Sequence, residues 1–106
     1  MTKQNTTRDA REHITGKLPK EELLAQLAEE ATELAHAALK LRRVLDGTNP
    51  TPVDHITAKS ALIEEIADVT LLLQLLELGM DDYGPDIKAT MNYKLRRWAE
   101  RLEAKE

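Results

Sequence analysis

The sequence contains no cysteine among its 106 residues, which excludes disulfide bonds and thiolate metal ligands. Its longest apolar run, Val69 to Leu76, is interrupted by Thr70 and Gln74 and falls far short of the roughly 20 residues needed to span a bilayer. The polar start of the chain offers no apolar segment typical of a secretory signal. We therefore expect a cytoplasmic protein with no membrane partner.

Strand-like alternation, internal repeats and low-complexity tracts are also missing from the sequence. Apolar residues instead recur at helical spacing, which predicts an all-α fold. We expect an N-terminal arm over residues 1–18 and a helical domain over residues 19–106. Its three main helices are expected over about 19–45, 58–78 and 86–104.

The central segment from Ala58 to Leu78 is apolar on nearly every side beyond its first turns. A surface helix carries one apolar stripe, whereas a helix that is apolar all round has to be enclosed by other helices. A chain of 106 residues is small for enclosing a helix by itself. We therefore predict a compact helical bundle of three main helices plus the arm, completed by oligomerisation.

Several residues mark the expected helix boundaries. Pro19 and Gly47 bracket the first long helix, Asp54 can cap the central helix, and Gly79 is expected to end it. The connection over residues 46–55 contains two prolines and is long enough to let the two helices lie antiparallel.

The N-terminal arm contains one possible short helix, over residues 8–14 with Thr7 as its cap. Only Ala10 and Ile14 are available for it to bury, so this helix is expected to be marginal and the arm loosely docked.

Charge is distributed unevenly along the chain. The net charge of -4 argues against a general nucleic-acid surface. Residues 46–87 hold nine acidic and one basic side chain, whereas residues 88–106 hold six basic and three acidic side chains. This pattern suits a ligand that needs a metal at one side and cations at the other, although ordinary variation of helix surfaces produces it as well.

Paired carboxylates occur on both of the first two long helices. Glu30 and Glu33 are three residues apart and share a helix face, and Glu65 and Asp68 repeat this geometry. Two antiparallel helices can point four such groups into one gap. Oxygen-rich sites suit hard cations, and Mg²⁺ in particular is often completed by phosphate oxygens of a substrate.

The last helix carries two stripes. Its apolar stripe, which includes Trp98, is predicted to lie in the core. Beside it runs a basic stripe of Lys94, Arg97 and Arg101, in which Lys94 and Arg97 could supply the cationic side of a polyphosphate site.

The order of these motifs resembles that of the MazG-type all-α nucleoside triphosphate pyrophosphohydrolases, over about residues 21–102. The matching motifs are Glu30-x-x-Glu33, then Glu65-x-x-Asp68, then Asn92-x-Lys94-x-x-Arg97. The resemblance implies a helical subunit that forms a homodimer or homotetramer around its central helices. It also implies Mg²⁺-dependent hydrolysis of an NTP or dNTP to the monophosphate and pyrophosphate, as in cleansing of the nucleotide pool. The interval between Glu33 and Glu65 is slightly longer than is usual in that family, and the proline loop is where the extra residues would be absorbed.

The resemblance also assigns roles to individual residues. Ligands for Mg²⁺, or for Mn²⁺ in its place, would be Glu30, Glu33, Glu65 and Asp68. Phosphate or sugar contacts would come from Lys94, Arg97 and Asn92. A carboxylate that the metal does not fully occupy, either Glu29 or Glu30, would orient or deprotonate the attacking water. Gln26 lies one turn ahead of Glu30 on the same face and is a candidate substrate contact.

Two other functions remain open at this point. Glu33-x-x-His36 has the spacing of di-iron carboxylate bundles, although the central helix offers Asp68 without a histidine at the matching distance. The other alternative is a non-catalytic helical interaction module whose carboxylates are surface charge.

Overall fold

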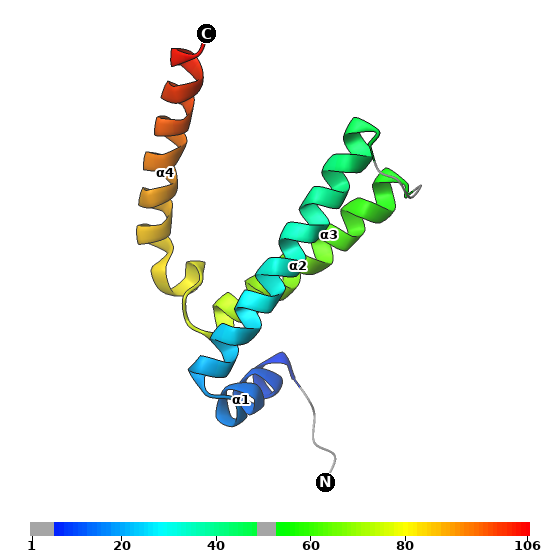
Figure 1. The fold of residues 1–106 in the computed structure, drawn as a ribbon. Helices are drawn as coiled ribbons and strands as arrows, with labels where there is room; N and C mark the ends of the chain where they lie inside the picture. The colour runs from blue at the N-terminus through cyan, green and yellow to red at the C-terminus, as the bar shows by residue number, and fades with distance from the viewer. Residues whose placement is uncertain (1–5, 49–52) are drawn as a thin grey trace.

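The computed structural model describes residues 6–48 and 53–106 of the chain. Within those residues it contains no strand and consists of helices α1 (Thr7–Lys17), α2 (Lys20–Asp46), α3 (His55–Leu75) and α4 (Met80–Ala104). Helices α2 and α3 lie side by side as an antiparallel hairpin, α1 lies across one end of it, and α4 extends away (Figure 1). The predicted all-α class is confirmed, and the predicted arm contains a helix of its own.

Helix α2 begins and ends close to its predicted boundaries. Pro19 precedes it in an extended conformation, and Gly47 ends it in the left-handed region with φ 77°. At the start of α3, the side chain of Asp54 accepts a hydrogen bond from the Thr57 amide at 2.7 Å, so the predicted cap is confirmed. The two prolines of the connection, Pro50 and Pro52, lie outside the described residues.

Helix α3 ends at Leu75 rather than at the predicted Gly79. Its C-terminus is closed by Glu77, which has φ 57°. The Leu78 amide donates to the Leu73 carbonyl at 2.9 Å and the Glu77 amide to the Gln74 carbonyl at 3.0 Å. This pair of bonds is a Schellman motif, which usually has glycine at the left-handed position. Glutamate at this position does not signal a helix end, so the C-terminus of α3 was predicted too late in the sequence.

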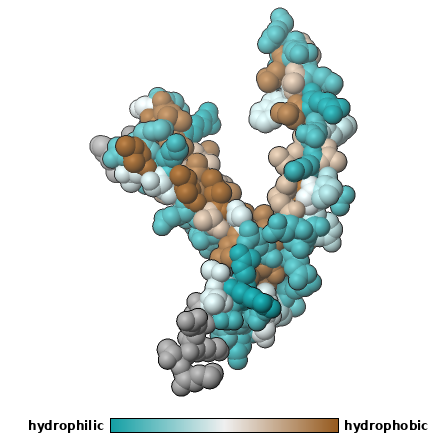
Figure 2. Space-filling model, turned by 180° about the vertical axis from the view of Figure 1, so that it is seen from behind, coloured by the Kyte–Doolittle hydropathy of each residue, from teal (hydrophilic) through white to brown (hydrophobic). Residues whose placement is uncertain are grey.

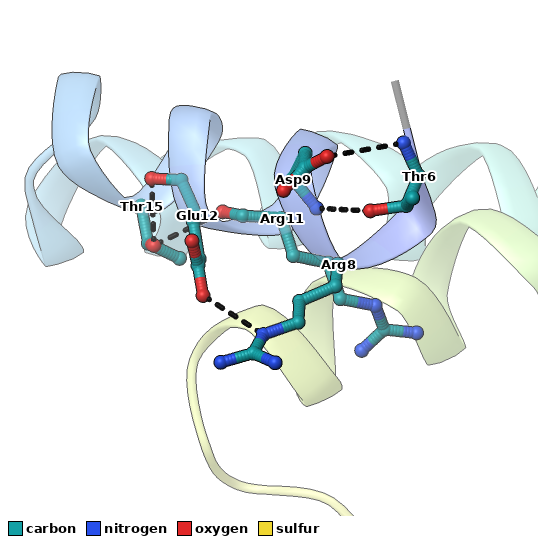
Figure 3. Close-up of polar contacts among 6 residues, drawn as sticks. All are labelled: Thr6, Arg8, Asp9, Arg11, Glu12 and Thr15. Atoms are coloured by element: carbon teal, nitrogen blue, oxygen red, sulfur yellow. Dashed lines mark hydrogen bonds and ion pairs between the residues drawn. The ribbon is translucent and has the colours of Figure 1, made fainter. Parts of the chain in front are cut away.

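Helix α1 is capped one residue earlier than predicted, by Thr6 rather than Thr7. The Asp9 amide donates to Thr6 Oγ1 at 3.0 Å, and the Thr6 amide donates to the Asp9 carboxylate at 3.4 Å (Figure 3). This reciprocal capping box satisfies two backbone donors of the first turn. An ion pair between Arg8 and Glu12 at 3.2 Å adds a further contact within the helix.

The core is small and lies where α1 meets the hairpin. Its buried members are Leu23 of α2 with Leu72, Leu75 and Leu76 from the C-terminal end of α3, and Ile14 and Leu27 pack against them. In contrast, Ile56, Ile63 and Ile66 of α3 remain 77%, 56% and 47% exposed. Helix α3 is thus apolar on more than one side, as predicted, and one chain covers only part of it.

Helix α4 kinks at Tyr83, where φ is -123° and ψ is 26°, just before Pro85. Its long part beyond Pro85 matches the predicted last helix. The apolar stripe does not reach a core in the single chain: Met91, Leu95, Trp98 and Leu102 are 59%, 64%, 63% and 54% exposed. Apolar surface is visible on both the hairpin and α4 (Figure 2).

One chain is extended rather than compact. Its radius of gyration is 18.2 Å, whereas a compact domain of this length has about 13 Å. The predicted compact bundle is therefore not formed by a single copy, because α4 does not pack along the hairpin. None of the helices in the described part of the chain is both long and apolar enough to cross a membrane.

Candidate metal centre

Three carboxylates converge between the two helices of the hairpin. Glu30 of α2 and Glu65 and Asp68 of α3 each present an oxygen, and these oxygens lie within 4.8 Å of one another. The antiparallel arrangement places Glu30 opposite α3, and the spacing of three residues brings Glu65 and Asp68 onto adjacent turns. Glu30 and Glu65 are half-buried, whereas Asp68 is exposed.

Glu65 is the residue most affected by this arrangement. Loss of solvent around its carboxyl raises its pKa, and the neighbouring Glu30 carboxyl raises it further by hydrogen bonding and by charge. The charges of Asp68 and Glu33 act in the same direction. One oxygen of Glu65, Oε2, is shielded from solvent and has no hydrogen-bond partner among the residues that the structure describes. A buried oxygen without a partner is costly, so this one is a ready acceptor for a cation or a proton.

The donor set fits a hard divalent cation. All three groups are carboxylates, and the unpartnered Oε2 atom of Glu65 would be satisfied by an ion that the three groups share. Mg²⁺ prefers oxygen ligands, commonly takes one or two carboxylates, and retains waters that leave room for phosphate oxygens. Mn²⁺ accepts the same ligand types.

The other two predicted carboxylates are not part of this cluster. Glu33 and Glu29 are exposed on α2 and lie outside the three converging groups. Glu33 still acts on the cluster, because its charge contributes to the raised pKa of Glu65. Glu29 precedes Glu30 by one residue and therefore points about 100° away around the helix.

The cluster opens into a cleft of about 350 Å³ between α1, α2 and α3. Gln26, a predicted substrate contact, lines this cleft together with Glu30 and Asp68. The remaining lining residues are Ile14, Leu18, Glu22, Leu23, Leu71, Leu72 and Leu75. Sequence reasoning missed this contribution of Ile14 of α1 and of Leu18, the extended residue that follows α1.

The predicted cationic residues lie on α4, which extends away from the cluster (Figure 1). Lys94 and Arg97 line a shallow depression of α4 itself with Tyr93. Arg97 Nη1 donates to the Tyr93 hydroxyl at 3.1 Å, and its guanidinium carbon lies 5.8 Å from the centre of the tyrosine ring. Asn92 is exposed on the same helix. A single chain therefore does not bring its basic residues to its acidic cluster.

In the described part of the chain, the metal-ligand cluster contains no histidine. His36, on which the di-iron alternative depends, is exposed and lies outside it. Comparisons of the chain with protein-family models, with curated proteins and with solved structures found no match. Its function is therefore inferred from its own geometry and from the order of its motifs.

Proposed function

We propose that the chain is a Mg²⁺-dependent nucleoside triphosphate pyrophosphohydrolase that acts on free nucleotides in the cytoplasm. The observation that carries the proposal is the convergence of Glu30, Glu65 and Asp68, in which one oxygen of Glu65 is shielded and unpartnered and the other two residues line a cleft. The resemblance of the motif order to the MazG-type enzymes supports the same reaction.

The three converging carboxylates would hold the cation. When bound, Mg²⁺ would neutralise the charge of the phosphates and polarise the phosphorus that the water attacks. Glu33, close enough for its charge to act on Glu65, would bind a water of the coordination shell or become a ligand after a rotamer change. Positioning and electrostatics dominate such transfers, so no nucleophilic serine or cysteine is required.

The attacking water would be oriented by a glutamate of α2. Glu30 lies within the cluster, and a carboxylate that binds metal through one oxygen keeps the other free to accept a proton. Glu29 is exposed beside it and is the alternative base. Both are retained as candidates because both lie at the same level of α2.

The basic residues would reach the phosphates only in an oligomer. The isoleucines of α3 and the apolar stripe of α4 are exposed in one chain, and burying these surfaces in a second copy would stabilise both. The hairpin is acidic, whereas residues 88–106 hold six basic and three acidic side chains, so copies of the chain also complement each other in charge. We propose a homodimer or homotetramer in which Lys94, Arg97 and Asn92 face a carboxylate cluster.

A panel of canonical and damaged NTPs and dNTPs, incubated with the protein and Mg²⁺, tests this function directly. The expected result is equimolar monophosphate and pyrophosphate, with no release when a chelator replaces the metal. Release of orthophosphate alone, or no product from any member of the panel, would reject the proposed reaction.

One observation favours a second function, that of a non-catalytic interaction module. The apolar stripe of helix α4 presents four exposed large side chains, and within the described residues α4 packs along no other helix, as expected of an interaction helix. If the chain is an interaction module, the panel should give no product and Mg²⁺ should not change the melting temperature. If it is the proposed enzyme, the panel should give product and Mg²⁺ should raise the melting temperature.

A further inference from the structure

We infer that α1 is a movable flap, which swings about the joint between Leu18 and Pro19 and controls access to the carboxylate cluster. The inference rests on the proposed function, because that function requires a ligand to reach the cluster. It adds a means of regulating the site, through a segment that the order of the motifs does not include.

The contacts that shape α1 lie within the helix and its two caps. At its start, the capping box between Thr6 and Asp9 satisfies backbone donors of the first turn (Figure 3). At its end, the Leu18 amide donates to the Ile14 carbonyl at 2.8 Å. None of these bonds involves the hairpin, so all of them persist when α1 moves as one body.

Few contacts attach α1 to the hairpin, and none of the residues of α1 is buried. Ile14 packs against the core, and the Arg11 guanidinium donates to the Gln74 side chain of α3 at 2.7 Å. Among the described residues this is the one side-chain hydrogen bond between α1 and the hairpin, and it lies in an exposed position. Such a bond adds little net stability, because water replaces either partner. Segments held by so few buried contacts open locally while the rest of a protein stays folded.

The joint between α1 and α2 is short and extended. Leu18 has φ -108° and ψ 123°, and Pro19 has φ -70° and ψ 162°. The first hydrogen bonds of α2 run from the Glu22 and Leu23 amides to the Pro19 carbonyl. A rotation about ψ of Leu18 leaves these bonds and the cap of α1 intact, because they lie on either side of it. Hinges are typically a few residues of this kind at the ends of elements.

Movement of α1 changes the space in front of the carboxylate cluster. Ile14 of α1 and Leu18 after it form one wall of the cleft, and Glu30 and Asp68 of the cluster line the same cleft. With α1 docked, the cleft has a volume of about 350 Å³, near the lower end of the range for small-molecule sites, about 300–1,000 Å³. A nucleoside triphosphate that arrives with a hydrated cation needs more room, so α1 swings out to admit it and to release the products.

A removable covalent tether tests the flap, because the chain has no cysteine of its own. In the double variant Arg11→Cys/Gln74→Cys, a bismaleimide linker with an internal disulfide replaces the two long side chains and fixes α1 to α3. We expect this tether to lower kcat/KM for nucleoside triphosphates at least about tenfold, because opening of a lid limits turnover in many enzymes. Reductant should restore the activity by cutting the linker.

The matched control carries the same linker within α1. Its cysteines replace Arg8 and Glu12, which are exposed and four residues apart on that helix. This linker bridges α1 to itself, so kcat/KM should equal that of the unmodified protein. Full activity of the protein tethered at residues 11 and 74, or an equal loss in the control, would overturn the inference.

Amide hydrogen exchange gives an answer that does not depend on turnover. Without a tether, amides of α1 should exchange at least about tenfold faster than those of Leu72 and Leu75, and the tether at residues 11 and 74 should remove most of this difference. Exchange in α1 as slow as in α3 would overturn the inference, whether or not a nucleotide is hydrolysed. Fast exchange that the tether slows, without hydrolysis of any nucleotide, would instead reject the proposed reaction and leave the flap in place.

Discussion

Helices α2 and α4 are nearly equal in length, 27 and 25 residues, and each carries an apolar stripe at helical spacing. Helix α2 packs along α3, whereas α4 packs along none of the other helices in the described part of the chain. The hairpin connection returns α3 along α2, but the turn at Glu77 and the kink at Tyr83 direct α4 away. Two helices with similar apolar stripes therefore differ in whether they find a partner helix in the same chain, and the direction that the chain takes after α3 decides this.

The strongest test of the hairpin is the loss of one carboxylate. Asp68→Asn should reduce pyrophosphate release by about 10²-fold or more, because it removes a charge that balances the cation in the transition state. Repulsion among the carboxylates falls, so the metal-free variant should melt at the same temperature as the parent or higher. The stabilisation by Mg²⁺ should shrink, since it depends on affinity.

Thermal melts with Mg²⁺ and with chelator, alongside a pyrophosphate assay, measure both effects. Glu64→Gln is the matched control, because Glu64 is an exposed carboxylate of α3 outside the cluster. A chelated Asp68→Asn protein that melts below the parent would show that Asp68 is structural.

Helix α4 is tested by a charge placed in its apolar stripe. Leu95 is 64% exposed in one chain and would be buried in the oligomer, so Leu95→Asp should convert the oligomer to monomers at micromolar concentration. Ala89→Asp places the same charge at an exposed residue of α4 away from the apolar stripe and should leave the mass unchanged. Light scattering that finds the unmodified protein monomeric at micromolar concentration would contradict the proposed assembly.

The basic stripe of α4 distinguishes a specific site from general charge. A phosphate contact by Lys94 is a charge-assisted hydrogen bond, so Lys94→Ala should raise KM by about tenfold or more. The fold should persist, because a helix tolerates alanine. Arg101→Ala on the same stripe should have little effect in steady-state assays, and an equal loss would show that only net charge matters.

The pH dependence of stability reports on Glu65. Its pKa is raised in the folded protein above the value of about 4.3 in the unfolded chain, so the folded state binds more protons in the interval between the two. The contribution of this group is therefore present below pH about 4 and is lost as pH rises through the folded pKa. In the Glu65→Gln variant, this loss of stability with rising pH should be absent. Thermal melts of parent and variant in the presence of chelator, across this pH range, measure the difference. A parent profile identical to that of the variant would contradict it.

The smallest expected effect concerns the turn at Glu77, which connects the hairpin to α4. Glu77 is a non-glycine residue at φ 57°, a conformation that costs roughly 1–2 kcal/mol for L-residues. Glu77→Gly should recover part of this, partly offset by the greater freedom of glycine when unfolded, for a net gain of about 0.5 kcal/mol. Urea titration of Glu77→Gly and of Glu77→Ala, which keeps a Cβ, measures the difference in their free energies of unfolding. No difference would mean that the turn is unstrained.

Sequence reasoning located the hairpin because its signals are local. The proline before α2, the glycine after it and the Asp54 cap each depend on neighbouring residues, and all three occur as predicted. It failed where residue type carried no information. Two consecutive threonines, Thr6 and Thr7, occur at the start of α1 and only geometry selects Thr6 as the cap. A glutamate occupies the left-handed position at the end of α3.

The site was predicted in the same uneven way. Spacing along each helix was enough to predict that Glu30, Glu65 and Asp68 come together, but spacing does not show that Glu33 stays outside the cluster. The cleft was missed because α1 contributes a wall only once it is docked. Periodicity correctly identified the apolar face of α4, yet it does not say which molecule covers that face.

The separation of α4 from the hairpin has a consequence for the order in which the protein acquires its structure. The hairpin pairs residues of one chain, so its refolding is first order and independent of concentration. Most of the stability of a helix in a protein comes from packing of its amphipathic face, so in the proposed oligomer α4 would become persistent only after two chains associate. Amide hydrogen exchange should therefore show protection in α2 and α3 at every dilution, and protection in α4 that fades as the protein is diluted.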